Sequence, residues 1–110
     1  MIISGGVNIY PQEIENVLVM HPAIEDVAVI GVPNADLGEE VKAVAQLVPG
    51  RVDGDDVRAE ILAFAREHLA LYKVPRSVDV LDALPRLETG KLYKRLLRDR
   101  YWGNKTSRIV

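Results

Sequence analysis

Runs of hydrophobic residues along the chain predict three strands of a core sheet. Residues 27–32 form a continuous apolar run of strand length, which is typical of a strand covered on both faces. A second run over residues 41–48 predicts a strand that pairs with the first as a hairpin and stops at Pro49-Gly50. A third core strand is expected over residues 77–81.

Apolar residues recur at helical spacing in the segments between these strands. A first helix is expected to begin at Pro11, because proline suits the first helical position, and to end before Pro22. The longest helix is expected to open at Asp53 or Asp55 and to run to about Ala70. Both helices carry an apolar stripe that would pack on the sheet.

The beginning of the chain predicts a β-hairpin. Residues 2–4 and 7–9 read as short strands, and Gly5-Gly6 between them matches a two-residue turn that needs positive φ. The predicted fold class is therefore α+β, with a small, mostly antiparallel three-stranded sheet packed by helices and an N-terminal β-hairpin. Residues 1–103 are expected to form the domain and residues 104–110 a flexible tail.

Composition limits the classes of protein to consider. The chain has 110 residues, 48% of them hydrophobic, which is enough for one small domain with one modest core. It has no cysteine, so disulfides and thiolate metal sites are excluded, and a cytoplasmic location is expected. No apolar run approaches the ~20 residues of a membrane span.

The net charge of −2 hides an asymmetry between the two ends of the chain. Residues 1–85 carry 6 Lys/Arg and 14 Asp/Glu, whereas residues 86–110 carry 8 Lys/Arg and 2 Asp/Glu. A basic end on an acidic body can serve nucleic acid, phosphate ligands or an acidic partner, and it can equally be a solvated helix face.

Lys91 is the first candidate for chemistry. A last helix is expected from about residue 91 to residue 101, with Thr89 able to cap its start. Helix starts favour acidic residues, yet this one would begin with cations, which the helix dipole repels. Binding of an anion would explain the arrangement, and Gly90 would allow a close approach. The alternative is an ordinary turn followed by a surface lysine.

The segment Ser4-Gly5-Gly6 is the second candidate. A glycine pair leaves room for a thin ligand against the backbone, and the alternative is that it only forms a hairpin turn. The histidines, His21 and His68, have no suggestive partners in the sequence. They are interpreted as surface or capping residues, and no metal site is predicted.

Five segments, in order, resemble the adenylate-forming enzymes. They are Ser4-Gly5-Gly6-Val7-Asn8-Ile9-Tyr10-Pro11-Gln12-Glu13-Ile14-Glu15 followed by His21-Pro22, Gly31-Val32-Pro33, Gly38-Glu39, Tyr72-Lys73-Val74-Pro75, and Leu84-Pro85-Arg86 with Thr89-Gly90-Lys91. Apart from its last few residues, the chain resembles the small C-terminal domain of an acyl-CoA synthetase, of the kind that joins fatty or aryl acids to CoA.

This resemblance implies a two-step reaction. A carboxylic acid and ATP with Mg would form an acyl-adenylate and pyrophosphate, and coenzyme A would then displace AMP to give acyl-CoA. Lys91 would be the adenylation lysine, Ser4, Gly5 and Gly6 would line the pantetheine tunnel, and Tyr72 could stack on the adenine of CoA.

The resemblance also implies a partner domain, and two residues of this chain depart from the pattern of some relatives. A large N-terminal domain, outside these residues, would bind most of the ATP, Mg and acid. The small C-terminal domain that this chain resembles would rotate between the two steps. Leu37 and Val74 stand where some relatives have an aromatic and a basic residue that grip the CoA nucleotide.

Two alternatives remain open. The chain could be a non-catalytic module whose basic C-terminal helix binds nucleic acid or an acidic partner, although that region lacks interleaved aromatic residues. It could also be a separate subunit that docks onto an N-terminal partner. The ligase interpretation expects no catalysis by this domain alone and no binding of nucleic acid.

Overall fold

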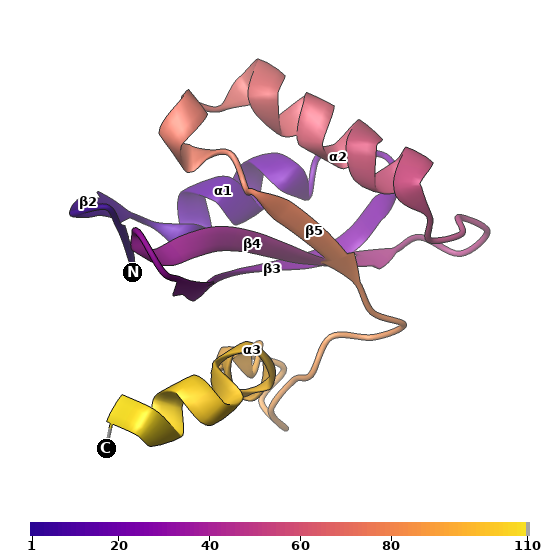
Figure 1. The fold of residues 1–110 in the computed structure, drawn as a ribbon. Helices are drawn as coiled ribbons and strands as arrows, with labels where there is room; N and C mark the ends of the chain where they lie inside the picture. The colour runs from indigo at the N-terminus through magenta and orange to yellow at the C-terminus, as the bar shows by residue number, and fades with distance from the viewer. Residues whose placement is uncertain (110) are drawn as a thin grey trace.

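A five-stranded sheet forms the centre of the molecule (Figure 1). The computed structural model describes the backbone of residues 1–109 and the side chains of residues 1–102. The strands are β1 (Ile2–Ser4), β2 (Val7–Ile9), β3 (Ile24–Asn34), β4 (Gly38–Leu47) and β5 (Ser77–Val80). The helices are α1 (Pro11–Leu18), α2 (Asp55–His68), the 3-10 turn η1 (Leu71–Lys73) and α3 (Lys94–Ile109).

Helices cover the sheet on both faces, as the apolar run at residues 27–32 predicts. Val27 and Val29 of β3 belong to the core under α1 and α2, whereas Ala28 and Ile30 belong to a second core that includes Leu97 of α3. Figure 1 shows α1 and α2 above the sheet and α3 below it. Because side chains alternate along a strand, one apolar run serves both cores.

The sheet differs from the prediction in having five strands instead of three. The N-terminal hairpin is part of it, since Ser4 of β1 pairs with Gly38 at the start of β4. β3 and β4 form the predicted antiparallel hairpin, while β5 runs parallel to β4 from the pairing of Lys42 with Ser77 onward. A parallel neighbour requires a crossover connection, which α2 provides.

The Gly5-Gly6 turn has the predicted conformation. The φ angles are +56° at Gly5 and +82° at Gly6, the positive pair that a tight hairpin turn requires. The Gly5 N–H also donates to the Leu37 carbonyl at 2.9 Å, so the tip of this hairpin is tied to the turn between β3 and β4.

The start of the last helix was predicted wrongly. Helix α3 begins at Lys94, not at Lys91, and Thr89 does not cap it. Arg86 forms a β-bridge with Leu92, and the Tyr93 N–H donates to the Pro85 carbonyl at 2.9 Å. These bonds hold the chain around Lys91 in a short hairpin, so the conflict between that lysine and a helix dipole does not exist.

At the other end, the backbone of α3 continues to Ile109, beyond the expected end at residue 101. The boundary between a domain over residues 1–103 and a flexible tail over residues 104–110 stays a prediction, because the side chains after Trp102 lie outside the described part of the chain.

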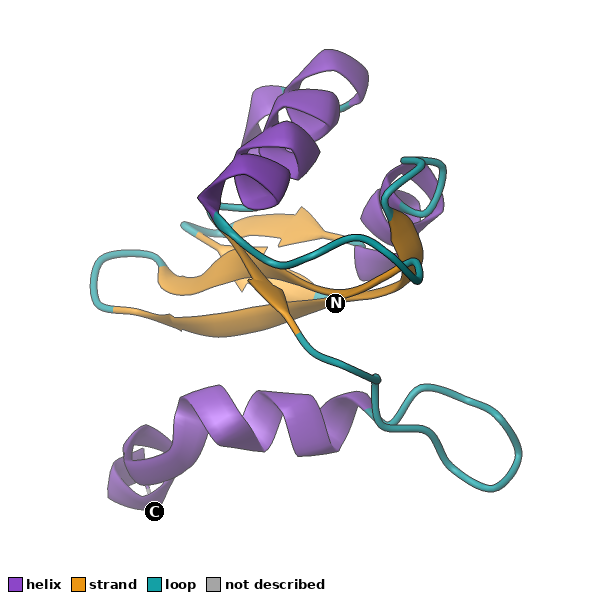
Figure 2. Ribbon diagram, turned by 90° about the vertical axis from the view of Figure 1, so that its right-hand side faces the viewer, coloured by secondary structure: helices purple, strands orange, loops and turns teal. Residues whose placement is uncertain are grey.

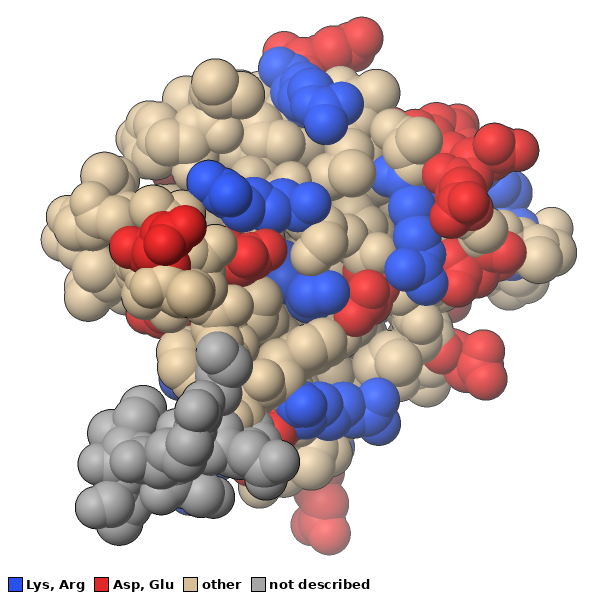
Figure 3. Space-filling model, in the orientation of Figure 1, with Lys and Arg blue, Asp and Glu red and all other residues tan. Residues whose placement is uncertain are grey.

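The basic C-terminal segment packs against the acidic body. Among residues whose side chains are described, three ion pairs join them, namely Arg86–Asp26, Lys94–Glu15 and Arg98–Glu39. On the face shown in Figure 3, blue and red side chains are interspersed. Within residues 1–109, no helix has the length and apolar character needed to cross a bilayer.

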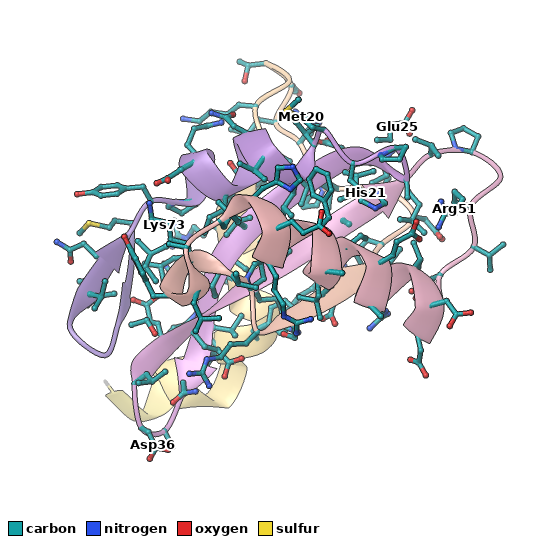
Figure 4. All side chains as sticks on the ribbon, turned by 90° about the horizontal axis from the view of Figure 1, so that it is seen from above. Met20, His21, Glu25, Asp36, Arg51 and Lys73 are labelled. Carbon is teal, nitrogen blue, oxygen red and sulfur yellow. The ribbon has the colours of Figure 1, made fainter. Side chains whose placement is uncertain are left out.

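His21 is buried, whereas the sequence suggested a surface or capping residue. Only 5% of its surface is exposed, its Nδ1 accepts the Ala23 N–H at 3.0 Å, and its ring packs edge-on against Phe64. His68 stacks on the same phenylalanine from the exposed side of α2. Both imidazoles thus belong to the packing of α2 over the α1–β3 connection, where Figure 4 shows His21.

Candidate functional site

An open cavity of about 850 Å³ lies between the N-terminal hairpin, the start of β4 and the η1 turn. It is lined by Ser4, Gly5, Val7, Ile9, Leu37, Val41, Arg66, Leu71, Tyr72, Val74, Pro75 and Arg76. Most of the lining residues are apolar, and Ser4, Tyr72 and two arginines add polar groups, a combination that suits an organic ligand with charged parts. Ser4, Gly5 and Tyr72, predicted from distant parts of the sequence, therefore meet in one cavity; Gly6 lies next to it in the same turn.

A lysine beside Tyr72 fixes the η1 turn against α1. The Lys73 ammonium lies 2.6 Å from a Glu13 carboxylate oxygen and 5.4 Å from the centroid of the Tyr72 ring. The hydrogen bond to Glu13 raises the pKa of Lys73, so the amine stays protonated. Tyr72 is 53% exposed, so it can meet a ligand at the mouth of the cavity.

Two arginines in the cavity wall were missed by the sequence analysis. Arg66 lies in the last turn of α2, and Arg76 lies between Pro75 and the start of β5. Both are exposed, and neither forms an ion pair with a described residue. Unpaired guanidinium groups beside an apolar cavity suit phosphate oxygens. For Arg76, the sequence did offer a signal, namely a basic residue directly after the Tyr72-Lys73-Val74-Pro75 motif.

Lys91 lies at the end of the hairpin formed by residues 86–92. Gly90 has φ +91°, and its N–H donates to the Leu87 carbonyl at 2.8 Å. The Leu87 N–H in turn donates to the Lys91 carbonyl at 2.8 Å. The lysine backbone is thereby fixed while its side chain is exposed and pairs with no carboxylate in the described part of the chain.

The lysine and the cavity lie on opposite sides of the sheet. Leu84 and Leu97, before and after the lysine hairpin, belong to the core under α3, whereas Val41 and Val74 of the cavity wall belong to the core on the α1–α2 side. Figure 2 shows the loop that carries the lysine on the same side as α3. The structure therefore divides the predicted site residues into two surfaces.

A partly buried polar network fastens α3 beneath the sheet. Asp79 of β5 receives the Lys42 ammonium at 3.0 Å and the Tyr101 hydroxyl. Burial alone would raise the pKa of Asp79, but the hydrogen bonds from Tyr101 and Lys42 outweigh it and the pKa is lowered. Burial and the bond to Asp79 raise the pKa of Tyr101 to about 12.

Comparison with known proteins decides the family. Residues 13–91 match the family model of the AMP-binding enzyme C-terminal domain, which is more than half of the chain. The chain belongs to this family. It is 51% identical over 102 residues to a feruloyl-CoA synthase from an Amycolatopsis species, covering 92% of this chain and 20% of that protein. It is 39% identical over 99 residues to a long-chain-fatty-acid–CoA ligase of Escherichia coli, covering 90% of this chain and 17% of the ligase.

Solved structures show the same fold. ATP-bound MatB from Rhodopseudomonas palustris superposes with a TM-score of 0.83 at 39% identity, covering 93% of this chain and 20% of that one. A Mycobacterium tuberculosis fatty acyl CoA synthetase gives a TM-score of 0.82, also at 39% identity, with 94% and 20% covered. This AMP-binding enzyme C-terminal domain thus spans about a fifth of the length of its relatives.

The family model covers Lys91 but only part of the cavity. The matched range ends at Lys91 and includes Tyr72, whereas Ser4, Gly5 and Gly6 precede it. Leu37 and Val74, the two departures noted in the sequence, both line the cavity. In this AMP-binding enzyme C-terminal domain the cavity wall is consequently apolar at both positions, and its positive charge comes from Arg66 and Arg76 instead.

Proposed function

We propose that this chain is the C-terminal domain of an ATP-dependent carboxylic acid:CoA ligase, and that its two surfaces serve the two steps of the reaction. Lys91 serves acyl-adenylate formation, and the cavity beside Ser4 and Gly5 serves thioester formation. The relatives named as CoA synthases and ligases support the reaction class, and the ATP-bound neighbour supports the nucleotide. This domain acts together with the large N-terminal domain that such proteins contain.

The observation that carries the proposal is the exposure of Lys91 without an acidic partner, on a fixed hairpin. In the first step a carboxylate oxygen of the acid attacks the α-phosphorus of ATP, and the bond to pyrophosphate breaks. Negative charge accumulates on the α-phosphate oxygens as this occurs. A preorganised ammonium lowers the barrier by stabilising that charge, and a lysine already paired with a carboxylate in its own domain would do so less well.

The cavity suits the second step. The sulfur of coenzyme A attacks the acyl carbon, the bond to the adenylate oxygen breaks, and AMP leaves. The small residues Ser4 and Gly5 leave space for the pantetheine arm, and Tyr72 offers a face for the adenine ring. Arg66 and Arg76 would receive the phosphates, which compensates for the apolar Leu37 and Val74.

The remaining parts of the active site are assigned to the large domain. The described residues contain no cluster of three or more His, Cys, Asp or Glu that could hold a metal ion, so Mg would be bound there together with ATP. The acid is defined only by its carboxylate, because its remaining contacts lie in that domain. Reaction in the cytoplasm stays a prediction from the sequence.

The test uses the full-length protein that carries this domain and measures each step alone. Adenylation is followed as acid-dependent exchange of pyrophosphate into ATP, and transfer is followed with preformed acyl-adenylate and CoA. Lys91→Ala should lower the exchange rate by roughly a hundredfold or more, in line with the loss of one oxyanion donor. Arg95→Ala is the matched control, because this exposed cation lies four positions away and forms no ion pair with a described residue. Wild-type exchange in Lys91→Ala would refute the role of the lysine.

A further inference from the structure

The hairpin that carries Lys91 is fastened to strand β3 by one arginine. The Arg86 guanidinium donates through one nitrogen to the carbonyl of Gly90 and through the other to a carboxylate oxygen of Asp26. Gly90 directly precedes Lys91, so this side chain links the backbone next to the lysine to the sheet. The other carboxylate oxygen of Asp26 accepts the Val27 N–H at 2.9 Å, which fixes the acid in turn.

A second ion pair holds the chain on the far side of the lysine. Lys94 is the first residue of α3, and its ammonium lies 2.6 Å from a carboxylate oxygen of Glu15. The Glu15 side chain is only 9% exposed, and the same oxygen accepts the Val29 N–H at 2.8 Å. The segment is thus fastened to β3 at two points: Arg86, before Lys91, binds Asp26, and Lys94, after Lys91, binds Glu15.

We infer that Arg86, held by Asp26, is a positioning residue for Lys91 in the adenylation step. The inference rests on the proposed role of Lys91. Arg86 does not touch the reacting atoms; it acts by fixing the Gly90 carbonyl, and with it the direction in which the lysine backbone leaves the turn. A lysine side chain has four rotatable bonds of its own, so its ammonium is preorganised only if the backbone that carries it is fixed.

Arginine is suited to this role for a geometric reason. The guanidinium group is a planar fork whose nitrogens donate in different directions, so one side chain can bind a carboxylate and a carbonyl at once. Gly90 must adopt φ +91°, a conformation that other residues rarely reach, and it therefore has no side chain of its own to anchor the turn. The anchor has to come from a neighbour, and Arg86 provides it.

The test compares Arg86→Ala and the milder Asp26→Asn with wild type in the full-length protein, each step measured separately. Both variants should lower kcat for adenylation while KM for ATP stays within about twofold, since only a contact made in the transition state weakens. The expected loss is roughly tenfold to a hundredfold for Arg86→Ala, as for a small displacement of a catalytic group, and smaller for Asp26→Asn. Transfer from preformed acyl-adenylate should stay within about twofold of wild type.

Two further measurements separate positioning from general stability. In a Lys91→Ala background, Arg86→Ala should cause no additional loss of adenylation, because residues that act as one unit are not additive. Hydrogen exchange of the peptide covering residues 84–93 should be faster in Arg86→Ala, while peptides from β3 and β4 should be unchanged. Arg51→Ala is the control, because Arg51 also pairs with a carboxylate, that of Glu60 at 2.7 Å. Glu60 lies on α2, which packs on the face of the sheet opposite to α3.

The outcomes separate the two claims. Adenylation at the wild-type rate in Arg86→Ala, or an equal loss in both steps, would overturn the positioning role while leaving the function of Lys91 intact. A further loss in the Lys91→Ala background would also overturn it. Wild-type adenylation in Lys91→Ala alone would refute the proposed function, and the positioning role would fall with it.

Discussion

The side chains of Glu15 and Lys94 meet at 2.6 Å and join the first helix of the domain to the last. The contact crosses the outer edge of β3, where the same carboxylate accepts the Val29 N–H at 2.8 Å. A buried acid therefore satisfies one backbone donor and one cation from two different elements. This contact connects α1, which packs on one face of the sheet, with α3, which packs on the other.

Replacement of this acid should destabilise the fold. Glu15→Ala leaves the Val29 N–H without its acceptor and Lys94 without its counter-charge, so we expect the free energy of unfolding to fall by about 1–3 kcal/mol. Glu15→Gln should cost less, because its carbonyl oxygen can still accept the N–H. Urea unfolding of this chain measures both. Glu25→Ala is the control, since the Glu25 side chain is exposed and its one hydrogen bond to a described residue comes from Gln46. It should change stability by less than about 0.5 kcal/mol. An equal effect of Glu15→Ala and Glu25→Ala would contradict the role of the buried acid.

At Gly6 the N-terminal turn depends on backbone conformation and not on space. At Gly6 a Cβ atom would meet nothing within 4 Å, yet φ is +82°. Gly6→Ala should therefore cost about 1–2 kcal/mol of stability through backbone strain alone, whereas the larger Gly6→Asn should cost less because asparagine adopts this region more readily. Thermal unfolding of the two variants gives the order. A greater loss for asparagine would show that the site lacks room, against this account.

The periodicity of the sequence was sufficient to predict the core of the fold. The apolar run at residues 27–32 and the glycine pair at Gly5-Gly6 are local signals, and the structure confirms the strand and the turn that they predicted. The two strands of the N-terminal hairpin were also predicted, but their place in the central sheet was not, because the pairing of Ser4 with Gly38 joins residues far apart in the chain. Such a pairing depends on how the hairpin packs, which no local pattern encodes.

The sequence was enough to predict several residues of the candidate site, but not the local structure around them or which of them share a cavity. Thr89, Gly90 and Lys91 looked like a helix start because threonine caps helices. The bridge from Arg86 to Leu92 and the contact of Arg86 with Asp26 instead hold this segment in a hairpin turn. These are tertiary contacts, so they override the local preference. Arg66 and Arg76 meet only because the η1 turn reverses the chain between α2 and β5, and their spacing in the sequence gave no sign of a shared cavity.

Stability should depend on pH through the contact between Asp79 and Tyr101. The pKa of Tyr101 is raised from 10.0 to about 12 by burial and by Asp79, so the neutral hydroxyl is the form that the folded state favours. Its contribution is complete below the unfolded pKa of about 10. It is then lost as the pH rises through the folded value. The difference in unfolding free energy between wild type and Tyr101→Phe should therefore shrink between pH ~10 and ~12.

The acid side of the same contact has the opposite sign. The pKa of Asp79 is lowered in the folded state, so its contribution is present above the unfolded pKa of about 3.9 and is lost as the pH falls through the folded value. The difference in unfolding free energy between wild type and Asp79→Asn should therefore shrink as the solution becomes acidic.

Tyr93→Phe is the control for Tyr101→Phe, because the Tyr93 hydroxyl has no hydrogen-bond partner among the described residues. A pH-independent difference for Tyr101→Phe would argue against the network.

The two arginines of the cavity should act on coenzyme A and not on ATP. Arg66→Ala and Arg76→Ala each remove an unpaired guanidinium from the wall, so we expect KM for CoA to rise by roughly tenfold, the scale of one charge-assisted hydrogen bond to phosphate. The adenylation rate should not change. Steady-state kinetics of the full-length protein with CoA and with pantetheine, which lacks the nucleotide, measure the effect. An equal rise in KM for both thiols would place the arginines away from the phosphates.

The central claim is that one domain presents different surfaces for the two steps. Lys91→Ala and Ser4→Phe test it together, because the first removes the cation and the second fills the cavity on the opposite side of the sheet. In the full-length protein, Lys91→Ala should lose pyrophosphate exchange and retain transfer from preformed acyl-adenylate, and Ser4→Phe should retain exchange and lose transfer. If either variant impairs both steps to the same degree, the assignment of one step to each surface is wrong.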